Sequence, residues 1–520
     1  MDEYNGWNFI LGIFIMNKPL NELKKNKNEF LSHSVTPDLG RRPEQKKFFE
    51  DLEYVKENSY AYRIGIFSFA DIDYNNFKIK SLGGGDPMKI KPFPGVSKKI
   101  KKVMNSERLS MYNHSAGDKE QRKEVVNYLN KIGIKEYLND DGVKNVVNEN
   151  NVIFTSSTSH AFSLLLKAIL RPYDVVLFTA PTYGLFAYYP ERIGGITKFI
   201  PLKSENNYLI DSKDLDLCIN NINKQLELEY SQKLDYIPKV VAFLNINPHN
   251  PIGSVMSKKQ KNILYNVAKI CEKHGVFIID DMVYKDIGYD INNQALPIAT
   301  FPEYFNSTIT LFGLSKSYGL AGLRAGVVVA NEEIIAKIRD LIFHNMDSLS
   351  LVQSTALSYC FSQYGSKKYN KYFSKINLHY MTNLEILKYF VFGENNTREK
   401  NKIKRLAYKV ISKVVGTGAL DGFYQSKGVK FAGNVLPEAG FFAVLDFSAV
   451  KGLKYKNCII ENEDELLYFL FRESGIKFIT GKSMGWPNKN QLIARITFSM
   501  KSEEFAKRLL LLNKALNMLY

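Results

Sequence analysis

One lysine stands out for its position rather than its residue type. Lys316 follows the apolar run Thr308–Leu311, and a glycine-rich turn leads from it to Arg324, eight residues further on. Because the chain has 70 lysines and arginines, a Ser-Lys pair alone carries no information. The glycines allow close backbone approach. A lysine at a desolvated strand end loses its proton more readily, and its amine can then attack a carbonyl carbon.

Four more segments place polar or aromatic groups directly after apolar runs. Taken singly, each has an ordinary structural interpretation as a helix N-cap, an Asn/Pro turn or a packed tyrosine. A helix N-terminus with free N–H groups and hydroxyls can also hold a phosphate. A buried carboxylate needs a cation or several hydrogen bonds, because its desolvation is costly. The segments are Phe154–Ala161, Ala180–Gly184, Asn247–Gly253 and Ile278–Tyr284.

The segment Leu311–Gly326 resembles the Ser-x-Ser-Lys-x-x-Gly-Leu-x-Gly-x-Arg-x-Gly signature of class I/II aminotransferases, which are fold-type I pyridoxal phosphate (PLP) enzymes. The resemblance implies that Lys316 holds PLP as a Schiff base and moves the substrate proton. It also implies that Ser315 and Arg324 bind the cofactor phosphate. Gly313 departs from the pattern, because the family often has a serine there, and we expect one hydroxyl ligand fewer.

The same resemblance assigns roles around the PLP ring. Asn247–Gly253 is similar to the family's Asn-Pro-x-Asn-Pro-Thr-Gly loop, so Asn250 would donate to the phenolic oxygen and also border the substrate. Tyr284 would share that oxygen. Asp281 would pair with the pyridine nitrogen and keep it protonated, which makes the ring an electron sink. Asp280 is the competing choice, and the spacing to Tyr284 favours Asp281.

Upstream segments supply the expected phosphate cup and the stacking ring. Ser157, Thr158 and Ser159 align with the family's Gly-Ala-Thr-type cup, although Ser157 replaces the usual glycine. Tyr183 matches the aromatic residue that stacks on the cofactor.

The substrate elements lie near the two ends of the matching region, which runs from residue 82 to 498. Gly85, within Leu-Gly-Gly-Gly-Asp-Pro, would let the backbone approach the substrate carboxylate. Arg495 lies in an apolar strand and therefore needs an anion. The family's use is a bidentate grip on the substrate α-carboxylate, and a structural ion pair is the alternative. Tyr112 would reach the cofactor phosphate of a partner subunit, which implies a homodimer with shared active sites.

Alternating helical and apolar segments must position these residues. Since the runs show little alternation of polar and apolar residues, they predict strands buried on both faces. We therefore expect an α/β fold, with a mostly parallel seven-stranded sheet flanked by helices and a smaller α+β domain built from N- and C-terminal segments. The seven runs are 151–155, 175–178, 197–200, 240–244, 276–279, 308–311 and 326–330.

The predicted division of the chain follows from this pattern. Residues 1–75 form an N-terminal extension or arm, and 76–105 contribute to the small domain and the substrate site. Residues 106–345 form the large PLP-binding domain, and 346–520 form the small domain with an insertion at about 394–435. The apolar stretch Trp7–Met16 is too short to span a bilayer and lacks the flanks of a signal peptide.

Composition narrows the functional classes. A net charge of +17 invites a nucleic-acid role, but the chain shows no recognition helix and no RNA-binding motif. The four cysteines form no CxxC pair, which favours a reducing, cytoplasmic setting and no metal site.

The leading hypothesis is PLP-dependent transfer of an amino group from an α-amino acid to a 2-oxo acid, without a nucleic-acid or membrane partner. A lyase, decarboxylase or oxidase on the same scaffold is the alternative. An aminotransferase-like transcription regulator is less favoured, because residues 1–75 show no helix-turn-helix pattern.

Overall fold

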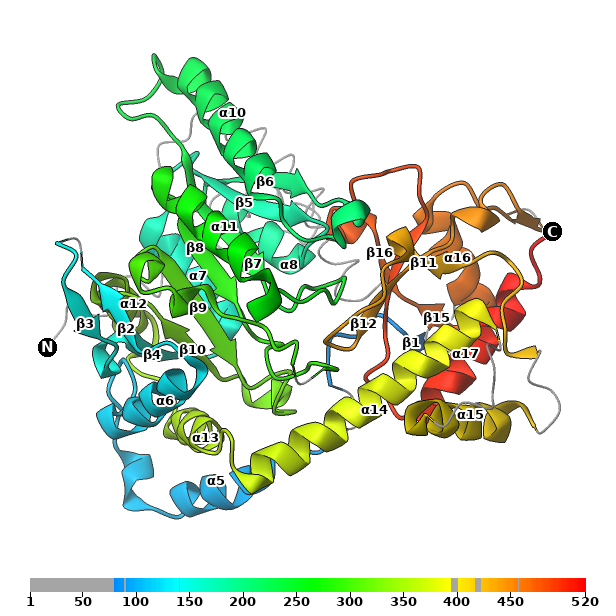
Figure 1. Ribbon diagram of the computed structural model, residues 1–520, viewed down its shortest axis with the longest axis horizontal. Coiled ribbons are helices and arrows are strands. Elements are labelled where there is room, and N and C mark those ends of the chain that lie inside the picture. Colours follow the sequence, from blue (N-terminus) through cyan, green and yellow to red (C-terminus); the bar gives the residue numbers. More distant parts are fainter. Residues whose placement is uncertain are drawn as a thin grey trace, which may run out of the picture. The chain divides into compact units, whose positions relative to one another are not determined.

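The computed structural model describes residues 79–87, 90–139, 141–290, 292–393, 401–416, 422–456 and 458–520. Its largest sheet has seven strands in the order β4-β10-β9-β8-β7-β5-β6 (Figure 1). Each of the seven apolar runs forms one of these strands, so the prediction of a seven-stranded sheet is confirmed. The strands are β4 (Val152–Thr155), β5 (Val175–Ala180), β6 (Ile196–Pro201), β7 (Val240–Ile246), β8 (Phe277–Asp281), β9 (Thr308–Gly313) and β10 (Gly326–Val329).

Strand direction decides where the loops of the sheet meet. Strands β6, β5, β7, β8 and β9 run parallel to one another. Strand β10 is antiparallel to both β9 and β4, so β4 again runs in the direction of β9. The C-terminal ends of β4, β5, β7, β8 and β9 therefore lie along one edge, where ligands of open α/β sheets usually bind.

Helices cover both faces of this sheet, which explains why its strands read as continuous apolar runs. In β9, Ile309 and Leu311 belong to the core on the side of α7 and α12, whereas Phe312 belongs to the core on the side of α6 and α13. Helices α10 and α11 cover β5, β7 and β8. The helices of this part are α5 (Val96–Met104), α6 (Lys119–Ile132), α7 (Thr158–Ile169), α8 (Gly184–Ala187), α9 (Tyr189–Arg192), α10 (Ser212–Tyr230), α11 (Lys261–Lys273), α12 (Glu332–Met346) and α13 (Leu351–Ser362).

The C-terminal part has its own four-stranded sheet, in the order β11-β12-β17-β16, and its own core. Strand β1 (Lys80–Ser81) pairs in parallel with β15 (Ile476–Lys477), so a segment from early in the chain joins C-terminal elements, as predicted. The other strands are β11 (Lys430–Phe431), β12 (Phe442–Asp446), β13 (Lys454–Tyr455), β14 (Cys458–Ile459), β16 (Ile479–Thr480) and β17 (Ile493–Thr497). Its helices are α14 (Lys367–Phe392), α15 (Lys402–Val415), α16 (Glu463–Ser474) and α17 (Ser502–Leu516).

The predicted insertion contains a packed helix. Helix α15 lies against α14 and α17 (Figure 1) and buries Ala407 and Ile411. Helix α13, which falls after the predicted boundary at residue 345, packs against α6 beneath the large sheet. The domain boundaries stay predictions, and the predicted arm at residues 1–75, including Trp7–Met16, lies outside the described residues.

A short hairpin of β2 (Glu136–Leu138) and β3 (Lys144–Val146) completes the described elements. In the described ranges, none of the helices combines the length and the apolar character that crossing a bilayer requires.

Candidate active site

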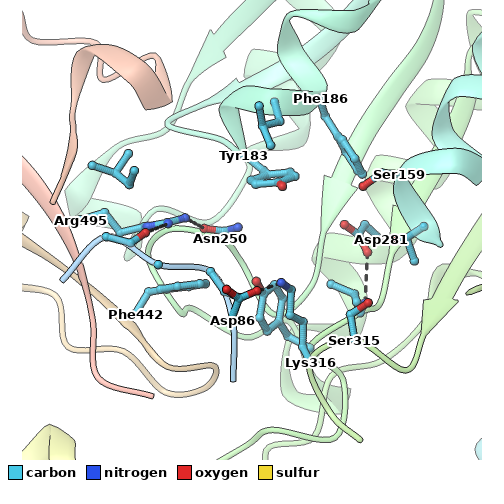
Figure 2. Close-up of a pocket in the computed structure, with 18 of the residues that line it drawn as sticks. Asp86, Ser159, Tyr183, Phe186, Asn250, Asp281, Ser315, Lys316, Phe442 and Arg495 are labelled. Carbon is cyan, nitrogen blue, oxygen red and sulfur yellow. Dashed lines mark hydrogen bonds between the residues drawn. The ribbon is translucent and has the colours of Figure 1, made fainter. Parts of the chain in front are cut away.

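A cavity of about 370 Å³ opens at the C-terminal edge of the large sheet (Figure 2). Its opposite wall comes from the segment after β1 and from the C-terminal sheet. The cavity is lined by Ser81, Gly83, Gly84, Gly85, Asp86, Thr158, Ser159, Tyr183, Leu185, Phe186, Asn250, Asp281, Val283, Tyr284, Ser315, Lys316, Arg324, Phe442, Lys477, Ile479 and Arg495. Most of the residues predicted from sequence are among them.

Lys316 projects into the cavity from the turn after β9. Its Nζ donates to the Gly85 carbonyl oxygen at 2.7 Å. Burial lowers the pKa of Lys316 to about 8; the charge of Asp86 opposes this shift, and that of Arg495 adds to it. The side chain is therefore an amine that is partly deprotonated near neutral pH, as a nucleophile or general base requires.

The two adjacent aspartates at the end of β8 have different surroundings. Asp280 accepts from Asn245 Nδ2 at 2.7 Å and from the Ile298 N–H at 2.9 Å, away from the cavity lining. Asp281 lines the cavity and accepts from the Val283 N–H at 3.1 Å. Burial raises the pKa of Asp281 to about 7 and that of Asp280 to about 6. Asp281 is thus a buried carboxylate that a cationic ligand would stabilise.

The N-terminus of α7 forms one end of the cavity. Thr158 and Ser159 line it, whereas Ser157 is buried behind them and caps the helix, its Oγ accepting from the His160 N–H at 3.1 Å. Ser157 has a φ of 131°, a conformation that favours the glycine the family pattern has there. A Cβ on Gly326 would lie 2.7 Å from the Ser157 carbonyl carbon, so only glycine lets β10 approach this turn.

Ser315 and Arg324 also line this part of the cavity. Arg324 is exposed, and its Nη1 donates to the Ala321 carbonyl oxygen at 3.0 Å. Gly313 stands where the family often has a serine, and the structure shows little room for a side chain there. A Cβ there would lie 3.0 Å from Thr158 Cγ2, so the threonine methyl fills space that a serine side chain would need.

Asn250, Tyr284 and Tyr183 line the cavity from the loops that follow β7, β8 and β5. Figure 2 shows Tyr183 beside Phe186 above Asn250, with Asp281 and Ser159 across the cavity. Asn250 is buried and accepts from Arg495.

Arg495 is buried in β17 and is held by neutral groups. Its Nη1 donates to Asn250 Oδ1 at 3.1 Å, its Nη2 donates to the Gly83 carbonyl oxygen at 2.9 Å, and its guanidinium carbon lies 4.1 Å from the centre of the Phe442 ring. Within the described ranges its Nε has no partner and no carboxylate lies within salt-bridge distance. A buried cation held only by neutral groups favours an anionic ligand over a structural ion pair.

The two remaining predicted residues differ in position. Gly85 lines the cavity and places its carbonyl oxygen against Lys316. Tyr112 is 89% exposed and does not line the cavity.

Several lining residues were not predicted from the sequence. Asp86 belongs to a segment that was recognised, and its carboxylate lies close enough to Lys316 to raise the pKa of that amine. Phe442 and Lys477 carried no sequence signal, since a phenylalanine in a strand and one lysine among many are ordinary. Only the pairing of β12 with β17, and of β1 with β15, brings the strands of Phe442 and Lys477 to the cavity.

These residues fit a phosphorylated, cationic aromatic cofactor that carries an aldehyde. Thr158, Ser159 and Arg324 would hold the phosphate, Asp281 the ring cation, and Lys316 the carbonyl carbon.

Comparison of the sequence with known proteins agrees with this geometry. Residues 81–387 match the family model described as aminotransferase class I and II. The chain is 26% identical over 268 residues to an aspartate aminotransferase of Musicola paradisiaca, a match covering 52% of this chain and 59% of that protein. It is 24% identical over 375 residues to a probable aspartate/prephenate aminotransferase of Aquifex aeolicus, covering 71% and 76%. The first of these matches therefore spans less than two thirds of its relative's length.

Solved structures share the fold at low sequence identity. An aspartate aminotransferase from Rhizobium meliloti superposes with a TM-score of 0.65 at 16% identity, covering 91% of this chain and 96% of that one. An aromatic aminotransferase from Pyrococcus horikoshii gives a TM-score of 0.63 at 18% identity, covering 84% and 96%. Because the family model covers more than half of the sequence, this chain belongs to the class I and II aminotransferases, a family of fold-type I PLP-dependent enzymes.

Proposed function

We propose that the protein transfers an amino group from an α-amino acid to a 2-oxo acid, with PLP held by Lys316. One observation carries the proposal: around a single cavity, an amine with a lowered pKa lies between a buried carboxylate and a buried guanidinium without a carboxylate partner. When bound, PLP would supply the carbonyl group and the electron sink for the reaction.

The roles of the residues follow from their positions. Arg495 would bind the substrate α-carboxylate with Nη1 and Nη2, while Asn250 and Phe442 fix the guanidinium plane. Asp281 would keep its charge opposite the ring nitrogen, because a cation at that position offsets the cost of its burial. Thr158, Ser159 and Arg324 would bind the phosphate.

Lys316 would serve twice. Its Nζ would hold the carbonyl carbon of the cofactor, and the same amine, once freed by the incoming substrate, would be placed to accept and return the proton of the substrate Cα. Burial favours the neutral amine needed for both tasks. The Gly85 carbonyl oxygen, 2.7 Å from Nζ, keeps the amine directed into the cavity.

A half-reaction screen tests the proposal. Purified holoenzyme is mixed with single amino acids, and loss of the cofactor absorbance is followed together with the products. We expect a 2-oxo acid and pyridoxamine phosphate. Release of ammonia, carbon dioxide or peroxide would instead support a lyase, decarboxylase or oxidase. Lys316→Ala should abolish the label that borohydride fixes on the wild-type chain.

The proposal includes a homodimer with shared active sites. Its support is the position of Tyr112, whose exposed side chain lies outside the cavity of its own subunit. All four cysteines are free thiols, which agrees with the proposed cytoplasmic setting.

A further inference from the structure

A second cavity, of about 430 Å³, shares no lining residue with the candidate active site. It is bordered by the C-terminal end of α6, by the segment that leads into α11 and by residues 296–301. Four of its lining residues are lysines, and within the described ranges its lining contains no carboxylate. The lining residues are Asn130, Lys131, Ile132, Gly133, Lys135, Lys258, Lys261, Leu296, Thr300 and Phe301.

The four lysines come from two segments that are distant in sequence, and all four are exposed. Lys131 and Lys135 lie at the end of α6 and in the turn after it. Lys258 and Lys261 lie in the short 3-10 turn before α11 and at the first residue of that helix. In the part of the chain that the structure describes, none of the four forms an ion pair. Lys261 instead places its Nζ 5.7 Å from the centre of the buried Phe301 ring.

Helix polarity explains only part of this cluster. Lys131 lies in the last turn of α6, where the partial negative charge of the helix end stabilises a cation. Lys258 and Lys261 lie at the opposite kind of helix end, and the first turn of α11 has no acidic residue to offset their charge. The partial positive charge of that helix end disfavours both lysines. An anion bound beside them would offset this cost.

The concave shape of the cavity concentrates the charge of the lysines. A cleft that is lined by one sign of charge and partly walled by apolar groups focuses the electrostatic potential and attracts counter-ions. Ile132, Leu296 and Phe301 supply the apolar part of the wall. Lysines that serve only solubility are usually interspersed with acidic residues. The cavity therefore favours an anionic ligand that several cations contact at once.

We propose that this cavity binds a small molecule that carries a chain of phosphate groups, either an inorganic polyphosphate or the phosphates of a nucleotide. Lysines on two walls can contact successive phosphates of one chain, whereas a single carboxylate or monophosphate would engage only some of them. The Asn130 amide also lines the cavity and would donate a further hydrogen bond. A volume of about 430 Å³ suits a small ligand, while a nucleic acid would need a basic stripe along an open surface. The site uses no residue of the proposed transamination and stands independently of it.

Isothermal titration of the PLP-loaded protein with inorganic tripolyphosphate tests the assignment. Bound PLP occupies the phosphate cup at α7, so that cup does not compete for the probe. At physiological salt we expect one tripolyphosphate per chain, bound at least about tenfold more tightly than inorganic phosphate. Lys131→Met/Lys261→Met removes one cation from each wall and should weaken binding by about tenfold. Lys131→Arg/Lys261→Arg keeps both charges and should stay within about threefold of the wild type.

A matched control removes the same charge outside the cavity. Lys259 is exposed and adjacent to Lys258 in sequence but does not line the cavity, and Lys489 is exposed in the loop before β17. Lys259→Met/Lys489→Met should leave the Kd for tripolyphosphate within about twofold of the wild-type value. Thermal unfolding and PLP content establish that all variants fold. Equal weakening in the control and the cavity variant would show attraction by net charge alone and would overturn the assignment.

Three further probes identify the source of the phosphates. ATP that binds no more tightly than tripolyphosphate indicates recognition of the phosphate chain alone, and tighter binding of ATP indicates a nucleotide. Either result supports the proposal when binding depends on the cavity lysines. Citrate bound as tightly as tripolyphosphate would contradict the choice of phosphate. The proposal is wrong if tripolyphosphate shows no saturable binding at about millimolar concentration, or if only binding of a duplex DNA depends on these lysines.

Discussion

At the scale of single residues, the two adjacent aspartates at the end of β8 differ in role. We expect Asp281 to serve the reaction and Asp280 to stabilise the fold. Asp281→Asn should lower the half-reaction rate at saturating amino acid by roughly two to three orders of magnitude, because a neutral amide cannot hold a protonated ring nitrogen. Asp280→Asn should leave the rate within a few-fold and instead lower the free energy of unfolding by about 1–3 kcal/mol. Asn245 and Ile298 donate to different oxygens of Asp280, and in the variant one of these acceptors becomes an NH2 donor. Stopped-flow spectroscopy and urea unfolding of the two variants measure these effects, and equal effects of both substitutions on the rate would contradict the assignment.

The lowered pKa of Lys316 predicts how cofactor uptake by the apoprotein depends on pH. Only the neutral amine attacks an aldehyde, and burial lowers the pKa to about 8. The rate of PLP uptake should therefore rise by roughly tenfold per pH unit below that value and level off above it. Asp86→Asn removes a charge that raises this pKa, so the midpoint should move to lower pH. An uptake rate that keeps rising to pH 10 would contradict the assignment.

Residue roles were predictable where they belong to contiguous motifs. Lys316 and Asp281 follow strands that are evident from sequence, so their motifs fix both identity and place. Lys477 was not predictable, because its position depends on the pairing of β15 with β1, almost 400 residues apart in the chain. Such long-range pairing leaves no local pattern in a lysine-rich sequence.

At the scale of elements, apolar runs predicted strands well but not their order. Six of the seven runs are largely buried on both faces, which leaves a strong local signal. The prediction of burial on both faces is wrong for β6, which lies at the edge of the sheet with Lys198 and Phe199 exposed. The antiparallel direction of β10 and the place of β4 beside it depend on tertiary packing, which short apolar runs do not encode. Helix α15 lies within the predicted insertion at about 394–435 but was not itself predicted, since only a narrow side of it, at Ala407 and Ile411, is buried.

The turn into α7 offers a stability test of this element. Ser157 combines φ 131° with ψ 164°, a region used almost only by glycine, and such strain costs on the order of 1–3 kcal/mol. Ser157→Gly should therefore raise the free energy of unfolding of the apoprotein by about 1 kcal/mol, because a glycine N-cap costs only a few tenths. Ser157→Ala keeps the strained backbone and loses the bond to His160, so it should lower that free energy by about 1 kcal/mol. Denaturant unfolding measures both values, and two changes of the same sign would contradict this account.

At the scale of the whole molecule, the cavity exists because two distant parts of the chain meet. Strand β1 adds to β15, and the glycines after it carry carbonyl oxygens to Lys316 and Arg495. Arg495 in turn contacts Asn250, which follows β7 of the large sheet. The substrate side therefore depends on contacts between the C-terminal sheet and the large sheet, whereas the phosphate cup belongs to the large sheet alone.

The proposed homodimer predicts complementation between two defective chains. Tyr112→Ala keeps Lys316 but would remove the hydroxyl group offered to the partner's cofactor, and Lys316→Ala has the opposite defect. In a heterodimer of the two variants, one site would combine the intact Lys316 of one subunit with the intact Tyr112 of the other. Random mixing of a two-fold dimer should therefore restore about one quarter of the wild-type number of active sites.

Co-refolding the two variants at equal concentration, followed by activity measurement and sedimentation, tests this expectation. Each variant refolded alone is the control, and Tyr112→Ala alone should show weakened PLP binding rather than a change in oligomeric state. If Tyr112 served the site of its own subunit, the intact Lys316 and the intact Tyr112 would never meet in one site, and mixing would restore nothing. Restoration to about one quarter would instead require that the exposed Tyr112 side chain reaches across the subunit interface.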